Sequence, residues 1–358
     1  MSIKRNELYI PHQAIVFAQQ DNICDFSLDK VGYAYQNRES NIGHEDALWE
    51  LEIHPTNGCD LLCKGCSYGS RHNEQCLTYE QVCRLVQENS KYDLKSVFFS
   101  GGGDPLHWNC WERFLNSVPK RFKYGISTNL YNFSNIKKSY SEIDFYQIHV
   151  VGFDRSECIR NTSKDVFELL DSNLKYLLKH RRSDQNVTLK ILINKENYRR
   201  IPFYLDYVMT MDANSIILKY QQDFLHNREL ARQEIVEEIR NTVYNHVIIG
   251  QYDYLIDNLD DSIFYVFPEP RECFFAKSGL YKLVDSKGRT FPCIAANAYG
   301  NSAVLKNNSL DIYTCMMKKK MCPLKACRHY RFSQYINQVL EGNVEIENKE
   351  YGDNGYLL

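Results

Sequence analysis

The sequence has no long apolar run, no strong net charge and no secretory leader, and each absence excludes a class of protein. None of its 358 residues belongs to an uninterrupted apolar stretch of roughly 18, so we expect no membrane-spanning helix. The formal net charge is only −2, which gives no overall field to attract nucleic acid or an anionic membrane. Acidic and amide residues follow Met1–Asn6 where a secretory apolar segment would stand. We therefore expect a cytoplasmic protein that binds neither nucleic acid nor membrane.

Cysteine, by contrast, is abundant. The chain has thirteen cysteines, although a reducing cytoplasm disfavours structural disulfides. Clustered cysteines in such a protein are typical of metal sites or reactive thiols. Apolar residues make up 44% of the chain, which is enough for a sizeable core, so the cysteines are not needed to hold a small fold together.

Short apolar segments alternate with amphipathic ones from residue 48 to residue 220, which predicts alternating strands and helices. We expect strands at 48–53, 96–99, 124–128, 145–151, 187–193 and 216–220. We expect helices after Thr78, which has capping-box spacing to Gln81, over 166–178 and over 230–243. The alternation implies a parallel sheet with right-handed crossovers. The predicted fold class is α/β, a partial (β/α)6 TIM-like barrel, with an open α/β sheet as the alternative; both bind ligands at the C-terminal ends of the strands.

The pattern changes after residue 250, which predicts a second, smaller module. Residues 282–291 have the pattern of a hairpin with Gly288 at its tip. The predicted division is an N-terminal extension (1–47), the barrel (48–250), a small C-terminal module held by cysteines (251–335) and a C-terminal tail (336–358).

Three cysteines, Cys59, Cys63 and Cys66, directly follow the first expected strand with C-x3-C-x2-C spacing. Three thiolates on one loop can hold three irons of a [4Fe–4S] cluster and leave the fourth iron without a protein ligand. An open metal position is what chemistry at a metal requires. The alternative is a zinc site completed by a residue such as His54 or His72.

A glycine loop, Ser100–Pro105, follows the second expected strand. Glycines let a backbone approach a ligand closely. A cysteine triad after one strand and a glycine loop after the next resemble the radical S-adenosylmethionine (SAM) superfamily. The resemblance implies that the open iron binds SAM, and that one electron splits SAM into methionine and a 5′-deoxyadenosyl radical, which abstracts hydrogen from a substrate.

The resemblance also implies contacts to SAM. Gly101, Gly102 and Gly103 correspond to the loop that contacts the methionyl amino group, and Asp104 stands where the family usually has glutamate. Tyr68 would approach the adenine in place of the aromatic residue that the family often has before its third cysteine, with packing as the alternative.

Two further residues follow later strands. Asn129 corresponds to a position that contacts the ribose or carboxylate of SAM, with a loop cap as the alternative. Arg160 corresponds to the family's partner of the SAM carboxylate, with a surface arginine as the alternative.

The second cysteine group resembles the start of a SPASM domain and of its shortened twitch form, through Cys273-x14-Gly288-x4-Cys293. These modules carry auxiliary [4Fe–4S] clusters. The resemblance implies one auxiliary cluster, for which the expected ligands are Cys273, Cys293, Cys322 and Cys327, with Cys315 in reserve. A zinc site or unrelated thiols are the alternative.

The resemblance leaves the substrate open. It favours a ribosomally made peptide that undergoes oxidative crosslinking, thioether formation or epimerisation. The alternatives are a small metabolite, such as a sugar or aminocyclitol, that is dehydrogenated or rearranged, and a non-catalytic zinc or Fe–S binding protein. An enzyme of this kind also needs an electron donor such as flavodoxin or ferredoxin. No hydrogen donor or catalytic base stands out in the sequence.

Overall fold

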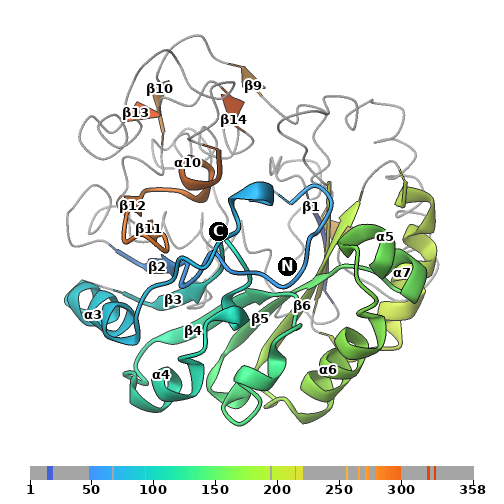
Figure 1. Cartoon of the computed structure of the whole chain (residues 1–358), viewed down its shortest axis with the longest axis horizontal. Helices are drawn as coiled ribbons and strands as arrows, with labels where there is room; N and C mark the ends of the chain where they lie inside the picture. The colour runs from blue at the N-terminus through green and yellow to red at the C-terminus, as the bar shows by residue number, and fades with distance from the viewer. Residues whose placement is uncertain are drawn as a thin grey trace, which may run out of the picture.

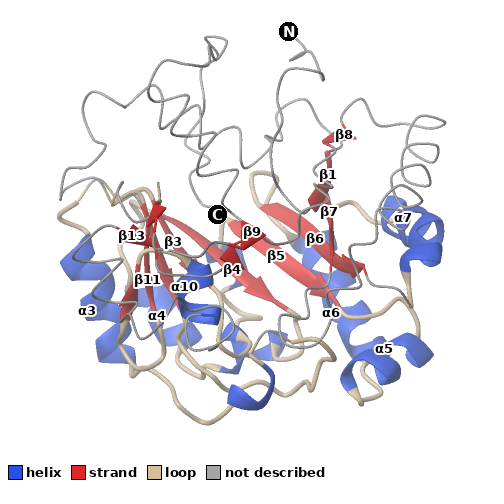
Figure 2. Cartoon of the chain, turned by 90° about the horizontal axis from the view of Figure 1, so that it is seen from above, coloured by secondary structure: helices blue, strands red, loops and turns tan. Residues whose placement is uncertain are grey.

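The structure, a computed structural model, forms a curved sheet with helices along its outer face (Figures 1 and 2). The described residues are 14–18, 48–66, 68–92, 94–193, 196–213, 215–220, 255–256, 265–266, 271–273, 279, 281–299, 321–322 and 326–327. Within these ranges no helix is both long and apolar enough to cross a membrane.

All six expected strands form, and each begins and ends close to its expected bounds. They are β2 (Glu50–Ile53), β3 (Ser96–Phe99), β4 (Lys123–Thr128), β5 (Phe145–Val150), β6 (Asn186–Ile193) and β7 (Ser215–Tyr220). They lie side by side in chain order, and every neighbouring pair is parallel. This arrangement confirms the α/β class with a parallel, partial-barrel sheet.

Both edges of this sheet carry strands whose position the sequence did not indicate. The full order is β12-β11-β2-β3-β4-β5-β6-β7-β1-β8. The expected hairpin forms from β11 (Tyr281–Val284) and β12 (Thr290–Phe291), and β11 pairs in parallel with β2. At the other edge, β1 (Ala14–Ala18) is antiparallel to both β7 and β8 (Leu255–Ile256). Residues from three of the predicted divisions therefore share one sheet, and the boundaries themselves remain predictions.

The described helices include two that were expected, α3 (Tyr79–Asn89) and α6 (Phe167–His180). Those that the sequence did not indicate are α4 (Trp111–Ser117), α5 (Arg155–Thr162), α7 (Ile201–Met209) and α10 (Ile294–Tyr299). The single 3-10 turns are η1 (Gly69–Arg71), η2 (Pro105–His107), η3 (Phe133–Asn135), η4 (Tyr140–Glu142) and η5 (Tyr198–Arg200). The helix expected over 230–243 lies outside the described residues.

Two small ribbons lie apart from the main sheet. They are β10 (Arg271–Glu272) with β13 (Met321–Cys322), and β9 (Tyr265–Val266) with β14 (Ala326–Cys327). Both ribbons are built from residues of the predicted C-terminal module.

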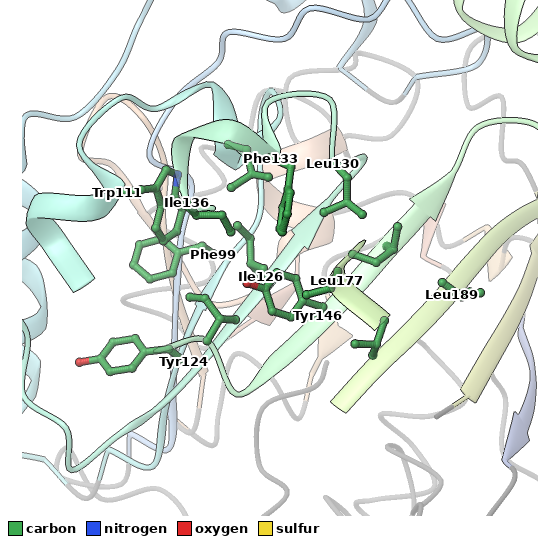
Figure 3. Close-up of a cluster of buried hydrophobic side chains, with 14 of the residues drawn as sticks. Phe99, Trp111, Tyr124, Ile126, Leu130, Phe133, Ile136, Tyr146, Leu177 and Leu189 are labelled. Atoms are coloured by element: carbon green, nitrogen blue, oxygen red, sulfur yellow. The ribbon is translucent and has the colours of Figure 1, made fainter. Parts of the chain in front are cut away.

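The hydrophobic core lies between the sheet and the helices on its outer face (Figure 3). Phe99 and Tyr146 from the strands meet Trp111 and Phe133 from the segments that follow β3 and β4, and all four are fully buried. Side chains alternate along each strand, so the next residue points to the inner face. On β2 this alternation places Leu51 and Ile53 in the core and Glu52 on the opposite face.

The start of α3 allows a direct test of local stability. Thr78 Oγ1 accepts a hydrogen bond from Gln81 N at 3.2 Å, and Gln81 Oε1 accepts one from Thr78 N at 2.7 Å. We expect Thr78→Ala to lower the free energy of unfolding by about 1 kcal/mol, because the N–H of Gln81 loses its side-chain partner. Urea denaturation measures the change. Thr78→Ser keeps the hydroxyl and serves as control, so equal losses in both variants would contradict the capping role.

Candidate functional site

The predicted site residues of the barrel lie beyond the C-terminal ends of four adjacent strands. Residues 54–66, which we call the cysteine loop, carry Cys59, Cys63 and Cys66 and follow β2. The glycine loop follows β3, Asn129 follows β4, and Arg160 lies on α5 after β5. The loop also reaches across to α5, because Lys64 N donates to Asn161 O at 2.7 Å. The sheet therefore gathers at one edge the motifs that the sequence spreads over a hundred residues.

The thiols of Cys59, Cys63 and Cys66 are half-buried and close enough to influence one another. Burial, together with the neighbouring thiols and the Asp104 carboxylate, raises the pKa of Cys59 to about 11 and that of Cys63 to about 12. Such thiols ionise when a metal cation binds them. This set of soft sulfur donors suits an iron–sulfur cluster.

Cys66 differs from the other two thiols. Burial raises its pKa, but the hydrogen bond with His72 Nε2, at 3.4 Å, and nearby backbone N–H groups bring the pKa below its ordinary value. His54, the other histidine weighed for a zinc site, is bonded to Glu52 and Tyr68. Among the described residues, no group of three or more His, Cys, Asp or Glu side chains is arranged to hold a metal ion. The cluster ligands therefore remain a prediction.

The glycine loop packs directly on the backbone of the cysteine loop. Gly103 N donates to Thr56 O at 3.1 Å, and Asp104 N donates to Gly58 O at 3.0 Å. A Cβ on Gly103 would lie 1.9 Å from Gly58 O, which no side chain tolerates. Glycine is required at this position because two backbones are in contact. This reason adds to the close approach of a ligand that the sequence suggested.

Asp104 is buried and holds the glycine loop to the end of β4. Its carboxylate accepts hydrogen bonds from Leu106 N at 2.9 Å, Thr128 Oγ1 at 2.8 Å and Asn129 N at 2.7 Å. Burial raises the pKa of Asp104 above its ordinary value, against the opposing effect of these hydrogen bonds. This capping role was missed, although aspartate before Pro105 is a sequence signal for a helical N-cap.

The other predicted SAM contacts have partners within the protein. Asn129 is buried, and its Oδ1 accepts from Tyr131 N at 2.8 Å, as a loop cap does. Arg160 lies in the last turn of α5, 3.6 Å from Glu157. Tyr68 comes two residues after Cys66, and its ring lies beside Gly102. The Arg71 guanidinium lies over this ring, with its Cζ 4.5 Å from the ring centre. Whether these residues contact SAM remains a prediction.

The second cysteine group is only partly described. Cys273 is buried and directly follows β10, where Arg271 pairs with Cys322 of β13, so both cysteines belong to one ribbon, two register positions apart. Cys293 precedes α10, and its sulfur accepts from Ala296 N at 3.4 Å. Cys327 ends β14, and Cys315 lies outside the described residues. The auxiliary cluster therefore remains a prediction.

The turn between β11 and β12 has the predicted geometry. Gly288 has a φ of 75°, a left-handed conformation that favours glycine. Asp285 accepts from the backbone N–H groups of Lys287 and Arg289, at 3.0 and 2.9 Å, and closes the turn. The hairpin thus returns the chain toward Cys293, as expected.

Comparison with known proteins agrees with this geometry. Residues 53–208 match the model of the radical SAM superfamily. The fold is similar to that of Streptococcus suis SuiB bound to S-adenosylmethionine, with 16% identity and a TM-score of 0.53, over 75% of this chain and 64% of that chain. It is similarly close to SuiB bound to its precursor peptide SuiA, with 14% identity and a TM-score of 0.54, over 75% and 64% of the two chains.

The chain thus spans less than two thirds of the SuiB chains that it resembles. No curated protein sequence matches it. The matched segment runs from the end of β2 to α7 and contains the cysteine loop, the glycine loop and the strand ends around them. This match, together with the parallel sheet that carries these loops, shows that residues 53–208 form a domain of the radical SAM superfamily.

Proposed function

We propose that Cys59, Cys63 and Cys66 bind a [4Fe–4S] cluster and that the chain cleaves SAM reductively. One observation carries this proposal: the glycine loop packs on the cysteine loop at adjacent strand ends, inside the segment that matches the superfamily. A cluster held by these cysteines would supply the one-electron chemistry that cleaves the sulfonium of SAM. The residues of the chain bind and orient SAM, and the buried inner wall of the sheet excludes water from the radical.

The SAM-binding residues in this proposal are Gly101, Gly102, Tyr68, Asn129 and Arg160. Gly103 and Asp104 hold the glycine loop against the cysteine loop and the end of β4. Arg160 offers a planar pair of donors to the SAM carboxylate, and it precedes Asn161, whose carbonyl accepts from Lys64 N of the cysteine loop.

Anaerobic purification tests the proposal. We expect a brown protein that releases 5′-deoxyadenosine from SAM under dithionite, with about eight irons if both clusters are present and about four if only one is. A colourless protein with one equivalent of zinc and no SAM cleavage would show that it is a zinc-binding protein.

We propose one auxiliary [4Fe–4S] cluster at Cys273, Cys293, Cys322 and Cys327, with Cys315 in reserve. The pairing of β10 with β13 supports this assignment, because Cys322 pairs with Arg271, two residues before Cys273. Replacing Cys273 and Cys293 with alanine should lower the iron content by about four per chain and leave SAM cleavage in place. An unchanged iron content would reject these ligands.

We propose a ribosomally made peptide as the substrate, and an electron donor such as flavodoxin or ferredoxin in a reducing cytoplasm. The likeness in fold to SuiB bound to a precursor peptide supports a peptide. A short open reading frame beside the gene identifies a candidate. The synthetic peptide should raise the rate of 5′-deoxyadenosine release and change in mass, whereas stimulation only by sugars or aminocyclitols would favour a small metabolite.

The contact between the two loops gives a further prediction. We expect Gly103→Ala to weaken SAM binding about tenfold or more, because its Cβ forces the loops apart and breaks the hydrogen bonds from Gly103 N and Asp104 N. Equilibrium dialysis of the iron-loaded protein measures the dissociation constant. Gly288→Ala is the control for backbone strain without a clash, since its Cβ meets nothing within 4 Å although its φ of 75° disfavours alanine. Equal affinity in both variants would show that the loop contact does not shape the site.

A further inference from the structure

A group of buried polar side chains occupies the inner wall of the barrel below the cysteine loop. Glu52 and His54 lie on and just beyond β2 and are 3% and 1% exposed. Ser100 reaches them from the end of β3, and Tyr281 reaches them from β11. Burying a carboxylate costs free energy unless hydrogen bonds compensate for the lost water. The partners of Glu52 therefore indicate its role.

Glu52 is held as a carboxylate. Ser100 and Tyr281 donate their hydroxyl hydrogens to its two oxygens, and His54 Nε2 lies 2.8 Å from Oε1. Burial raises the pKa of Glu52, but the His54 contact and the two hydroxyl donors outweigh burial and bring the pKa below its ordinary value. The charge on Glu52 is therefore satisfied by groups from three strands.

This carboxylate fixes the orientation of the His54 ring. Nε2 carries a hydrogen that it donates to Glu52, because an ionised carboxylate can only accept. The other nitrogen, Nδ1, then faces the hydroxyl oxygen of Tyr68 at 3.3 Å. A ring held in this way presents Nδ1 to Tyr68 at a fixed place.

Tyr68 joins this group to the two loops of the SAM site. It comes two residues after Cys66, and its Cε1 lies 3.3 Å from where a Cβ on Gly102 would stand. Its hydroxyl donates its one hydrogen to Oδ1 of Asn297 on α10, so the phenol oxygen acts as an acceptor toward His54 Nδ1. The phenol is thus held from the barrel by His54 and from the C-terminal segment by Asn297.

We propose that Glu52 and His54 are positioning residues for SAM: Glu52 orients His54, and His54 fixes Tyr68 against the glycine loop. This inference rests on the proposed function. Tyr281 on β11 and Asn297 on α10 complete the arrangement. The SAM site is thus assembled from the barrel segment and from residues 281–299. The C-terminal segment then shapes SAM binding independently of any cluster it carries.

Two variants test the proposal in the full, iron-loaded chain. In Glu52→Gln we expect the dissociation constant for SAM to rise about tenfold, because the neutral amide no longer fixes the His54 ring. Tyr68→Phe removes the hydroxyl that contacts His54 and Asn297 and should weaken binding to a similar extent. Equilibrium dialysis gives the dissociation constant. For 5′-deoxyadenosine release, KM should rise and kcat at saturating SAM should stay within about twofold, as expected when an interaction acts on binding alone.

Glu50→Gln is the matched control. Glu50 lies on the same strand and face, two residues earlier, and is equally buried. A loss caused merely by changing a buried glutamate would appear in both variants. Equal SAM affinity in Glu52→Gln and Glu50→Gln, or wild-type affinity in Tyr68→Phe, would overturn the proposal. If Glu52→Gln does not fold, Tyr281→Phe, which removes one donor to Glu52, and Tyr68→Phe decide the matter.

The two levels of the hypothesis fail in different ways. Wild-type protein that contains no iron and does not bind SAM would reject the proposed function. Wild-type protein that binds SAM, with variants that bind it equally well, would reject only the positioning role and leave the network as a structural joint between β2 and β11.

Discussion

Replacing Cys59, Cys63 and Cys66 together with alanine is expected to abolish the release of 5′-deoxyadenosine from SAM under dithionite. The three thiols are the protein's only expected ligands to the SAM-binding cluster, so their loss removes both the electron source and the iron that holds SAM. We expect the iron content to fall by about four per chain and the rate to fall to that of SAM without protein. High-performance liquid chromatography of the nucleoside product measures the rate.

The chain provides a matched control for this experiment. Cys76, Cys83 and Cys110 lie nearby in the sequence, are exposed or half-buried, and are not expected to bind a cluster. The variant with alanine at these three positions should keep its iron and its activity. If the Cys59, Cys63 and Cys66 variant cleaves SAM as fast as wild type, the site has been assigned wrongly. If the control loses activity, thiol loss in general explains the effect.

The sequence predicted the barrel strands well because buried parallel strands have a simple pattern. Apolar runs such as Ser96–Phe99 are buried on both faces and end in glycine or polar residues, and each became a strand. The sequence also indicated that the candidate loops lie together, because they follow successive strands and parallel strand ends meet at one edge; which residues bind the cluster and SAM stays a prediction. Order along the chain was therefore enough to place the loops near one another.

The remaining features depend on contacts that no local pattern reveals. The hairpin at 281–291 was predicted, but its parallel pairing with β2 joins segments more than 200 residues apart. Strand β1 lies in a region with weak periodicity, and it forms because β7 offers a free edge. The sequence did contain a signal for Glu52 and His54. Polar residues at alternate positions in Glu50–His54 indicate that one face of the strand is polar. Their partner Tyr281 could not have been found from that signal.

Trp111→Ala is expected to lower the free energy of unfolding by about 3–5 kcal/mol, a large part of the stability of an ordinary domain. Trp111 is fully buried on α4, and its ring packs edge-on against Phe99 at 4.8 Å and Trp108 at 5.5 Å between ring centres. Alanine leaves a cavity there and also removes the hydrogen bond from Trp111 Nε1 to Pro105 O, at 2.8 Å. Guanidinium denaturation of the full chain, followed by circular dichroism, measures the loss.

The position of Trp111 links this stability to the site, because Pro105 directly follows Asp104 of the glycine loop. We expect Trp111→Phe to lose less, about 1–3 kcal/mol, since a smaller ring still fills most of the space but no longer donates to Pro105 O, which keeps only its hydrogen bond from Trp108 N. Leu169→Ala on α6 is the surface control, because Leu169 is 43% exposed and its change should stay within about 0.5 kcal/mol. A Trp111→Ala loss as small as that of Leu169→Ala would mean that the core beneath the glycine loop does not support it.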